Sequence, residues 1–348
     1  MKLIKPYFEI LEQAPGIEGL YKHIELCGRN AYKSEDKITE DSAKTFVDKI
    51  CKAKHESVLE HGTVYLKILW EYKNYMDFEY SEIFYNLNKY SICKRELRKE
   101  DLCPTLYITT NYRVLKENNR LEDLKYICEP TEKHEKRVSV RFVCSRSTSL
   151  ELVRHRKFSF TQESQRYCNY SKNKFGNELT FIIPEWCPEI REDSNKGWDP
   201  CSIYDKFYLQ HLQMAEDTYF SLLKQWDEKL PDKRYKSGFK NNPWTPQEAR
   251  EVLPNSTKTD IIITGFISDW EHFFELRTAE NAHPEMRRLT IPLKEEFIKG
   301  KNCQKYPEGL SGIQCRRQYL CIGAQRHQRH KLESGCQQQY PRNSLCKT

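Results

Sequence analysis

A group of cationic side chains between residues 151 and 170 is the part of this sequence best suited to chemistry. The segment reads ELVRHRKFSFTQESQRYCNY and carries Arg154, Arg156 and Arg166 beside His155. Hydroxyl and amide side chains separate these cations, whereas a solvated helical face usually pairs them with Glu and Asp. A planar guanidinium beside Ser, Thr and Gln suits phosphate and carbonyl groups, because it donates paired, charge-assisted hydrogen bonds. The segment therefore predicts a site for an anionic ligand; an ordinary basic helix end, favoured by the helix dipole, is the competing interpretation.

The segments around this group have the periodicities of strands and amphipathic helices. The expected strands are residues 63–70, 137–144 and 179–183, and the expected helices are residues 41–54, 147–156 and 204–228. Capping-box spacings that begin at Thr245 and at Ser268 predict two more helix starts. Because strands and helices mix without βαβ regularity, the sequence predicts an α+β fold.

Two stretches depart from this pattern. Residues 71–136 are rich in Tyr, Lys and Glu without a clean period, which indicates an insertion or an elaborated helical segment. Residues 300–348 hold five of the fourteen cysteines and many glutamines, so we expect a disordered or loosely packed tail without a catalytic role. A zinc site in this tail would need an unfamiliar ligand spacing, so no metal is expected. The catalytic domain is then residues 1–299.

Composition narrows the classes of protein to consider. Hydrophobic residues make up 38% and charged residues 31%, which is typical of a soluble globular chain. The formal net charge of +7 lies entirely in residues 301–348, which hold nine Lys or Arg and two Glu, so the rest is neutral and no nucleic-acid partner is expected. No apolar run approaches a membrane span or a signal-peptide core, so we expect no membrane partner and a cytoplasmic location. The absence of C-x-x-C favours reduced thiols.

The same cationic segment carries a family signature. Arg154-His155-Arg156, followed after seven residues by Ser164, is the R-H-R-x7-S motif of the flavin-dependent thymidylate synthases, which this chain resembles. Residues 55–61 (HESVLEH) resemble the family's H-E-[ST]-x-x-E-H segment. Residues 248–254 (EAREVLP), 273–277 (FFELR) and 282–287 (AHPEMR) resemble its C-terminal blocks in the same order. The resemblance covers roughly residues 20–298 and leaves the tail outside.

The resemblance implies a reaction and a set of site residues. It implies reductive methylation of dUMP to dTMP in a homotetramer with intersubunit active sites, with methylene-tetrahydrofolate as carbon donor, FAD as hydride carrier and NADPH as reductant. The implied dUMP contacts are Glu151, Arg154, Gln162, Glu163, Ser164, Gln165, Arg166, Arg250 and Arg277. The implied FAD contacts are Ser57, Arg154, His155, Arg156, Gln162 and His272. Arg277 would favour the ionised imide of uracil and His55 would lie near the reacting centre, so these two are the implied catalytic residues.

The residue chemistry agrees with these implied roles. The chain contains no G-x-G pair, so neither a Rossmann fingerprint nor a P-loop is available for the pyrophosphate of a flavin. The arginine group is the best supply of donors for it. A permanent cation such as Arg277 near the uracil imide would lower the pKa of that imide by stabilising the anion.

Some assignments stay open at this level. Phe266 and Ser268 stand where many family members carry Asn and Arg that contact FAD, so a catalytically inactive flavin- or nucleotide-binding homologue is the alternative function. We expect His61 to be structural and His283 to cap the helix that follows it. Tyr167 can belong either to the core or to the site.

Overall fold

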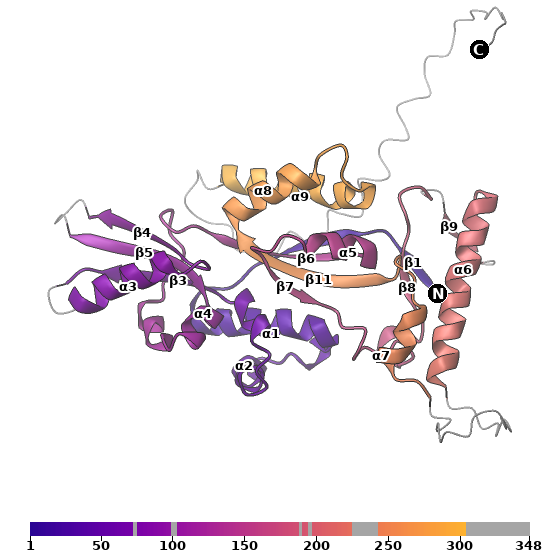
Figure 1. Cartoon of the computed structure of the whole chain (residues 1–348), viewed down its shortest axis with the longest axis horizontal. Coiled ribbons are helices and arrows are strands. Elements are labelled where there is room, and N and C mark those ends of the chain that lie inside the picture. The colour runs from indigo at the N-terminus through magenta and orange to yellow at the C-terminus, as the bar shows by residue number, and fades with distance from the viewer. Residues whose placement is uncertain (72–74, 99–102, 188–189, 194–196, 225–242, 304–348) are drawn as a thin grey trace, which may run out of the picture. The chain divides into compact units, whose positions relative to one another are not determined.

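The computed structural model describes residues 1–71, 75–98, 103–187, 190–193, 197–224 and 243–303 (Figure 1). The chain divides into two compact units, Met1–Phe297 and Ile298–Thr348. The elements that concern the site belong to the first unit. The predictions about Trp226, which the expected helix 204–228 included, and about residues 304–348 lie outside the described residues.

A four-stranded antiparallel sheet in the order β2-β6-β11-β7 forms the centre of the first unit. Its strands are β2 (Tyr7–Leu11), β6 (Arg137–Ser145), β11 (Lys258–Phe266) and β7 (Ser159–Gln162). β6 and β11 pair along their whole length, from Lys258 opposite Ser145 to Phe266 opposite Arg137. Both are rich in β-branched and aromatic residues, which pack well on a pleated surface. β6 confirms an expected strand, whereas β11 was not predicted.

The two faces of this sheet differ in chemistry. Ile261 and Ile263 of β11 pack with Trp270 on a face covered by α8 (Ile267–Arg277) and α9 (Pro284–Cys303). Asp260 and Thr264 alternate with them and meet Lys33 and His61 from the side of α1 (Gly16–Tyr32). The period of two along β11 therefore separates an apolar layer from a polar one.

A second, three-stranded antiparallel sheet lies in the order β3-β5-β4. Its strands are β3 (Thr63–Leu69), β5 (Pro104–Asn111) and β4 (Ile92–Leu97). Around it the chain forms α2 (Ser42–Lys52), η2 (Glu56–His61), α3 (Tyr75–Leu87), α4 (Tyr112–Glu117) and η4 (Leu121–Tyr126). Leu20 and Ile24 of α1 pack with Val64 and Ile108 in its core. Residues 71–136 thus supply two strands that the expected helical segment did not include.

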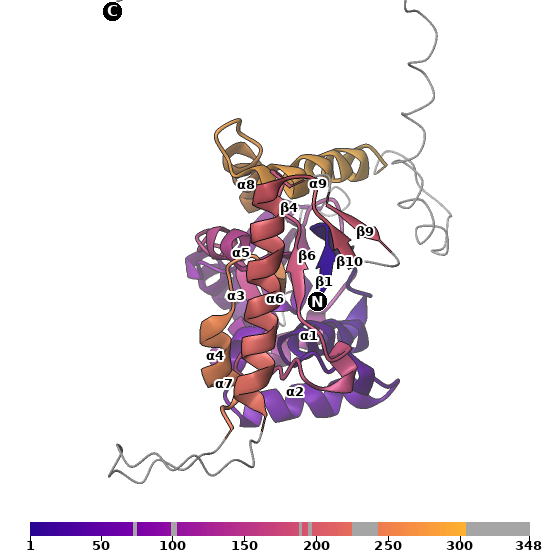
Figure 2. The ribbon, with the colours of Figure 1, turned by 90° about the vertical axis from the view of Figure 1, so that its right-hand side faces the viewer.

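A third apolar core lies among elements that include β1 and α6, whose ribbons are labelled in Figure 2. It contains β1 (Lys2–Ile4) paired in parallel with β8 (Thr180–Ile182), together with α6 (Ile203–Leu223), α7 (Pro246–Ala249) and η6 (Arg250–Val252). The remaining elements are η1 (Glu35–Lys37), α5 (Arg146–Leu152), η5 (Asn173–Phe175), β9 (Arg191–Asp193) and β10 (Gly197–Asp199). Leu209, Leu212 and Tyr219 of α6 are buried here, as its amphipathic pattern predicted.

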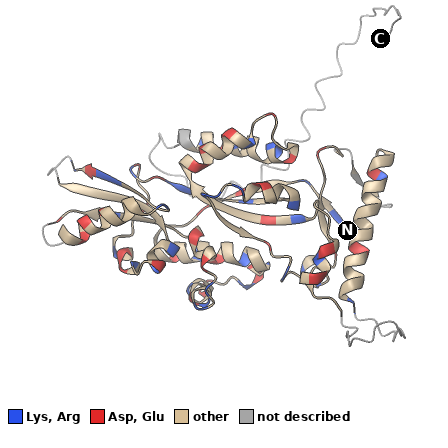
Figure 3. Cartoon of the chain, viewed as in Figure 1, with Lys and Arg blue, Asp and Glu red and all other residues tan. Residues whose placement is uncertain are grey.

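The α+β class is confirmed, and so is the capping box at Thr245. The expected cap at Ser268 is wrong, because α8 begins at Ile267 with Phe266 as its N-cap. The helix expected to reach Arg156 ends at Leu152. Among the described helices none is both long and apolar enough to cross a membrane. Figure 3 shows basic and acidic residues interspersed along the described elements.

Candidate active site

The end of α8 and the end of α5 meet through Arg277, which is 16% exposed. Its Nε donates to His155 Nε2 at 2.8 Å, and its two terminal nitrogens donate to Glu151 Oε2 at 2.6 Å and to the Glu151 carbonyl at 2.9 Å. These bonds use three of the five guanidinium N–H groups. The structure therefore brings together three residues that the sequence placed in the site, and it leaves donor capacity on Arg277.

Helix α9 fixes both ends of this contact. The Glu285 carboxylate accepts from Ser145 N at 2.8 Å and from Ser145 Oγ at 2.7 Å, which anchors the start of α5. Thr290 donates through Oγ1 to the carbonyl of Arg277 at 2.8 Å, which anchors the end of α8. His283 accepts from Glu285 N at 3.2 Å and so caps α9, as expected. These local bonds position Glu151 and Arg277 relative to each other.

Burial and the nearby Arg277 charge lower the pKa of His155 to about 4. Its ring packs edge-on against Phe273 at 4.8 Å between centroids. His155 is therefore neutral at ordinary pH, and because Nε2 accepts from Arg277, the proton resides on Nδ1. His272 also acts on the pKa of His155, which places these two predicted flavin contacts near each other.

Residues 162–163 join this region to the central sheet. Gln162 donates through Nε2 to Ser149 Oγ at 2.9 Å and to Thr259 Oγ1 at 3.1 Å. Glu163 is 2% exposed and accepts from Tyr170 OH at 2.8 Å and from Lys258 Nζ at 2.8 Å. Both carboxylate oxygens of Glu163 are thus occupied within the chain. In this structure the Glu163 carboxylate therefore holds Tyr170 and Lys258, and its contact with dUMP stays a prediction.

The loop after Glu163 leads to the segment that carries Arg250. Ser164 N donates to the carbonyl of Ala31 at 2.9 Å, and Arg166 Nε donates to Gln247 Oε1 at 2.9 Å. Gln247 belongs to α7, which leads directly into Arg250 at the start of η6. In the described part of the chain, Gln165 Nε2 is buried without a hydrogen-bond partner. Arg166 and Arg250 are therefore held on adjoining segments.

Three predicted cofactor contacts lie at the surface. Arg154, Arg156 and Ser57 are exposed. Within the described ranges, neither of these two arginines makes a side-chain hydrogen bond or ion pair. Their guanidinium groups are available to an anionic ligand.

His55 and His61 take different roles. His55 is exposed, and its Nδ1 lies 3.3 Å from the hydroxyl of Tyr32, whose ring contacts that of Tyr167 at 5.4 Å. Tyr167 is itself exposed, so it does not belong to the core. His61 is fully buried, with ring nitrogens 2.7 Å from Thr264 Oγ1 and 2.9 Å from Thr161 Oγ1. The structural role expected for His61 is confirmed.

Residues that no sequence motif marks also belong to this region. Tyr32 and Ser149 contact predicted site residues, and Arg146 lies close enough to Arg250 for the two charges to interact. Arg146 stands where an apolar strand becomes a helix, eight positions before Arg154. That junction was the available signal, but no motif marked it.

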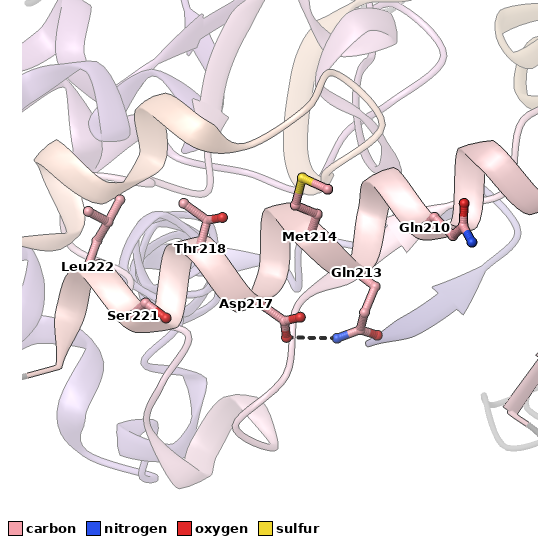
Figure 4. Close-up of a pocket in the computed structure, with 7 residues that line it drawn as sticks. All are labelled: Gln210, Gln213, Met214, Asp217, Thr218, Ser221 and Leu222. Carbon is pink, nitrogen blue, oxygen red and sulfur yellow. Dashed lines mark hydrogen bonds between the residues drawn. The ribbon is translucent and has the colours of Figure 1, made fainter.

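Neither a metal site nor the hollow along α6 is a better candidate functional site than this region. Among the described residues no group of three or more His, Cys, Asp or Glu side chains can hold a metal ion. An open hollow runs along α6 and is lined by Gln210, Gln213, Met214, Asp217, Thr218, Ser221 and Leu222 (Figure 4). This lining contains no cation and none of the predicted site residues. The exposed arginines that could bind an anionic ligand therefore lie outside this hollow.

A family model matches the part of the chain that contains most of this region. Residues 133–300 match the model of a family described as thymidylate synthase complementing protein, and this range contains Arg154, Ser164 and Arg277. The family resemblance inferred from R-H-R-x7-S is thereby confirmed for this range. His55 and Ser57 lie before it, and their roles stay predictions.

Two curated relatives show the extent of the similarity. A flavin-dependent thymidylate synthase of Mycobacterium bovis (strain BCG / Pasteur 1173P2) is 33% identical over 152 residues, which cover 42% of this chain and 51% of that protein. Another, from Mycobacterium sp. (strain KMS), is 32% identical over 156 residues, or 44% and 55% of the two chains. The matches thus span about half the length of these relatives.

One solved structure is also similar. A UMP/dUMP methylase PolB from Streptomyces cacaoi, bound with 5-Br dUMP, aligns over 86% of this chain and 93% of that chain at a TM-score of 0.36 and 14% identity. We draw no conclusion from a likeness at this level.

Proposed function

We propose that this chain is a flavin-dependent thymidylate synthase that converts dUMP to dTMP with methylene-tetrahydrofolate, FAD and NADPH. The observation that supports this most strongly is the contact of Arg277 with both Glu151 and His155. The family match of residues 133–300 supports the same reaction.

The residues present suit a flavin whose pyrophosphate is held by side chains. Arg154 and Arg156 are exposed donors in the described chain and can neutralise a pyrophosphate. His155, Gln162, His272 and Ser57 are the further proposed contacts. When bound, FAD would supply the hydride for the reductive step.

Arg277 is the proposed activating group for dUMP. Its charge is permanent, so it stabilises an ionised uracil imide at any working pH. Neutral His155 fixes the Nε side of the guanidinium without adding a second charge. Glu151 fixes the other side, so a side chain with many rotamers is oriented before substrate binds.

We further propose that a homotetramer assembles the complete site. In the described part of the chain, no hydrogen bond joins His55 or Ser57 to the contact between Arg277 and Glu151. Intersubunit sites would allow the His55 side of one subunit to meet the arginines of another. The substrates are dUMP and a reduced folate, bound as small molecules.

Release of tritium from dUMP labelled at carbon 5 tests the reaction. The protein, given NADPH and methylene-tetrahydrofolate, is expected to release tritium in proportion to dTMP formed. Arg277→Ala should keep its flavin and lose dUMP-dependent release. Arg95→Gln, an exposed arginine on β4 paired with Glu82, is the matched control and should behave as the parent. Equal release by the parent and Arg277→Ala would refute the role of Arg277.

A catalytically inactive flavin- or nucleotide-binding homologue is the second candidate. Phe266 caps α8 and lies against Arg137, whose guanidinium is 5.5 Å from the ring centroid. Phe266 therefore has a packing role where many family members carry a flavin contact. A yellow protein that releases no tritium under the conditions above would favour this candidate.

A further inference from the structure

Helix α3 presents a continuous apolar stripe to the solvent. Four residues at helical spacings of four, three and four positions form this α3 stripe: Met76, Tyr80, Ile83 and Leu87. These residues are between 58% and 81% exposed. Single exposed apolar residues are common on proteins, whereas a contiguous apolar patch marks a surface that binds a partner. The α3 stripe is therefore a candidate interaction surface.

The stripe lies on a helix that its own core holds in place. α3 packs beside β4 and β5 (Figure 1), and Phe78 and Tyr85 on its inner face are fully buried. The hydroxyl of Tyr85 donates to Asp123 Oδ2 at 2.6 Å. The guanidinium of Arg120 lies 5.1 Å from the centroid of the Tyr80 ring. The stripe is thus a preformed surface that needs little ordering when a partner binds.

An antiparallel pair of α3 helices, related by a two-fold axis, matches apolar residues with apolar residues. With the axis at the middle of the stripe, Met76 of one copy lies opposite Leu87 of the other. Tyr80 of one copy then lies opposite Ile83 of the other. A two-fold contact between identical chains requires self-complementarity of this kind. The equal spacing of the stripe in both directions therefore allows it to pair with itself.

The exposed charges at the two ends of the stripe favour the same arrangement. Asp77 follows the first residue of the stripe, and Lys89 lies just beyond the last one. In the antiparallel pair, Asp77 of one copy lies opposite Asn86 of the other, about one helical turn before Lys89. Opposite charges therefore approach each other at both ends, whereas a parallel pair would bring like charges together. This pattern fits a second copy better than a partner that carries a single sign of charge.

The size of the contact sets its strength. Four side chains of this size on each copy would bury about 1,000 Å² in total, which is near the lower limit for a specific protein interface. A contact of this size is weak when it acts alone. Association through the stripe should therefore depend on the protein concentration.

We propose that the α3 stripe is an interface between two copies of this chain, paired antiparallel across a two-fold axis. The stripe lies outside residues 133–300, which the family model matches, and no predicted site residue belongs to α3. The contact is therefore additional to those that would complete an active site between subunits.

Analytical ultracentrifugation over a range of protein concentrations tests the interface. Ile83→Glu places a charge at the middle of the stripe and should reduce the mass of the assembly to about half that of the parent at high concentration. Its melting temperature should stay near that of the parent, because Ile83 is exposed. Ile17→Glu, at an exposed isoleucine of α1, is the matched control and should keep the mass of the parent. Equal masses for Ile83→Glu and the parent at every concentration would overturn the proposal.

Exchange of the two end charges separates a second copy from any other partner. Asp77→Lys should weaken self-association by about threefold or more, because like charges then meet at both ends. The double variant Asp77→Lys with Lys89→Asp restores opposite charges only if the partner is an identical chain in the antiparallel orientation, and it should recover the association of the parent. Failure of the double variant to recover would overturn the antiparallel pairing. Neither measurement uses flavin or dUMP, so both remain decisive if the proposed function fails.

Discussion

Arg277 shows how a single side chain can be prepared for catalysis by its neighbours. Three of its N–H groups are fixed by Glu151 and His155, so the guanidinium loses little rotamer freedom when a substrate binds. A lysine at this position would keep the charge but has no planar fork with which to hold both partners. Charge alone is therefore not enough for the proposed role.

We expect Arg277→Lys to retain its flavin and to lose turnover by about 10²-fold, similar to the removal of one preorganised electrostatic donor. The tritium assay measures turnover, and the visible spectrum measures the flavin. Full turnover in Arg277→Lys would show that orientation by Glu151 and His155 is unimportant.

Buried histidines predict a loss of stability in acid. Burial lowers the pKa of His61 to about 3 and that of His23 to about 4, while both have an ordinary pKa of 6.5. Above pH 6.5 both are neutral in the folded and the unfolded chain. Below it the unfolded chain takes up protons first, so the free energy of unfolding should fall as the pH falls from 6.5 toward 4, by about 1.4 kcal/mol per pH unit for each histidine.

Urea denaturation at several pH values measures this dependence. His61→Gln removes one titrating group and should flatten the slope between pH 6.5 and 4, whatever its effect on the absolute stability. An identical slope in the parent and the variant would contradict the assignment to His61.

At the scale of elements, β11 holds the loop after β7 through buried ion pairs. Burial alone would raise the pKa of Asp260. The pKa is nevertheless lowered to about 2 by three neighbouring cations, Lys258, Lys33 and Arg141. The Asp260 carbonyl accepts from Glu163 N at 2.8 Å, and Lys258 also contacts the Glu163 carboxylate. β11 therefore positions the loop that begins at Glu163.

Asp260→Asn should leave three cations without their shared carboxylate and destabilise the fold by about 3–5 kcal/mol. We also expect a higher KM for dUMP, because the loop after Glu163 would be held less firmly. Urea denaturation and steady-state kinetics measure the two effects. Unchanged stability would show that the buried network does not hold β11 to α1.

Replacing Gly265, in the same strand, with a larger residue should disturb the packing around it. A Cβ atom at this position would lie 2.4 Å from Cδ1 of Phe158. At this distance the two atoms clash, so the Phe158 ring or the backbone would have to move. Gly265→Ala should cost about 1–3 kcal/mol by overpacking. Gly300→Ala, where no atom lies within 4 Å of the added Cβ, is the control. Equal melting temperatures for these two variants would contradict the packing around Phe158.

The elements that the sequence predicted are those with one dominant period. Apolar and polar residues alternate along β6, so the sequence predicted this strand. β11 contains three successive isoleucines and is buried on both faces, so its sequence shows no such alternation. The motif located Arg154 and Ser164, but it did not show that Glu163 turns inward toward Lys258. Arg146 has no motif, and only the fold places it near Arg250.

At the scale of the whole molecule, the proposed tetramer predicts complementation between defective subunits. If His55 of one subunit and Arg277 of another reach one site, co-expressed Arg277→Ala and His55→Ala chains will form some sites that lack neither residue. The mixed protein should then recover tritium release that each variant lacks alone. No recovery in mixed tetramers, confirmed by light scattering, would place His55 and Arg277 of a site in one subunit.

We propose that arginines of this chain hold a flavin and dUMP in one site. Titration of the isolated protein with dUMP, followed by its visible absorbance spectrum, tests this arrangement. The protein should be yellow, and its flavin bands should shift with added dUMP until the site is saturated. A colourless protein that gains no flavin on reconstitution, or a flavin spectrum that does not respond to dUMP, would contradict it.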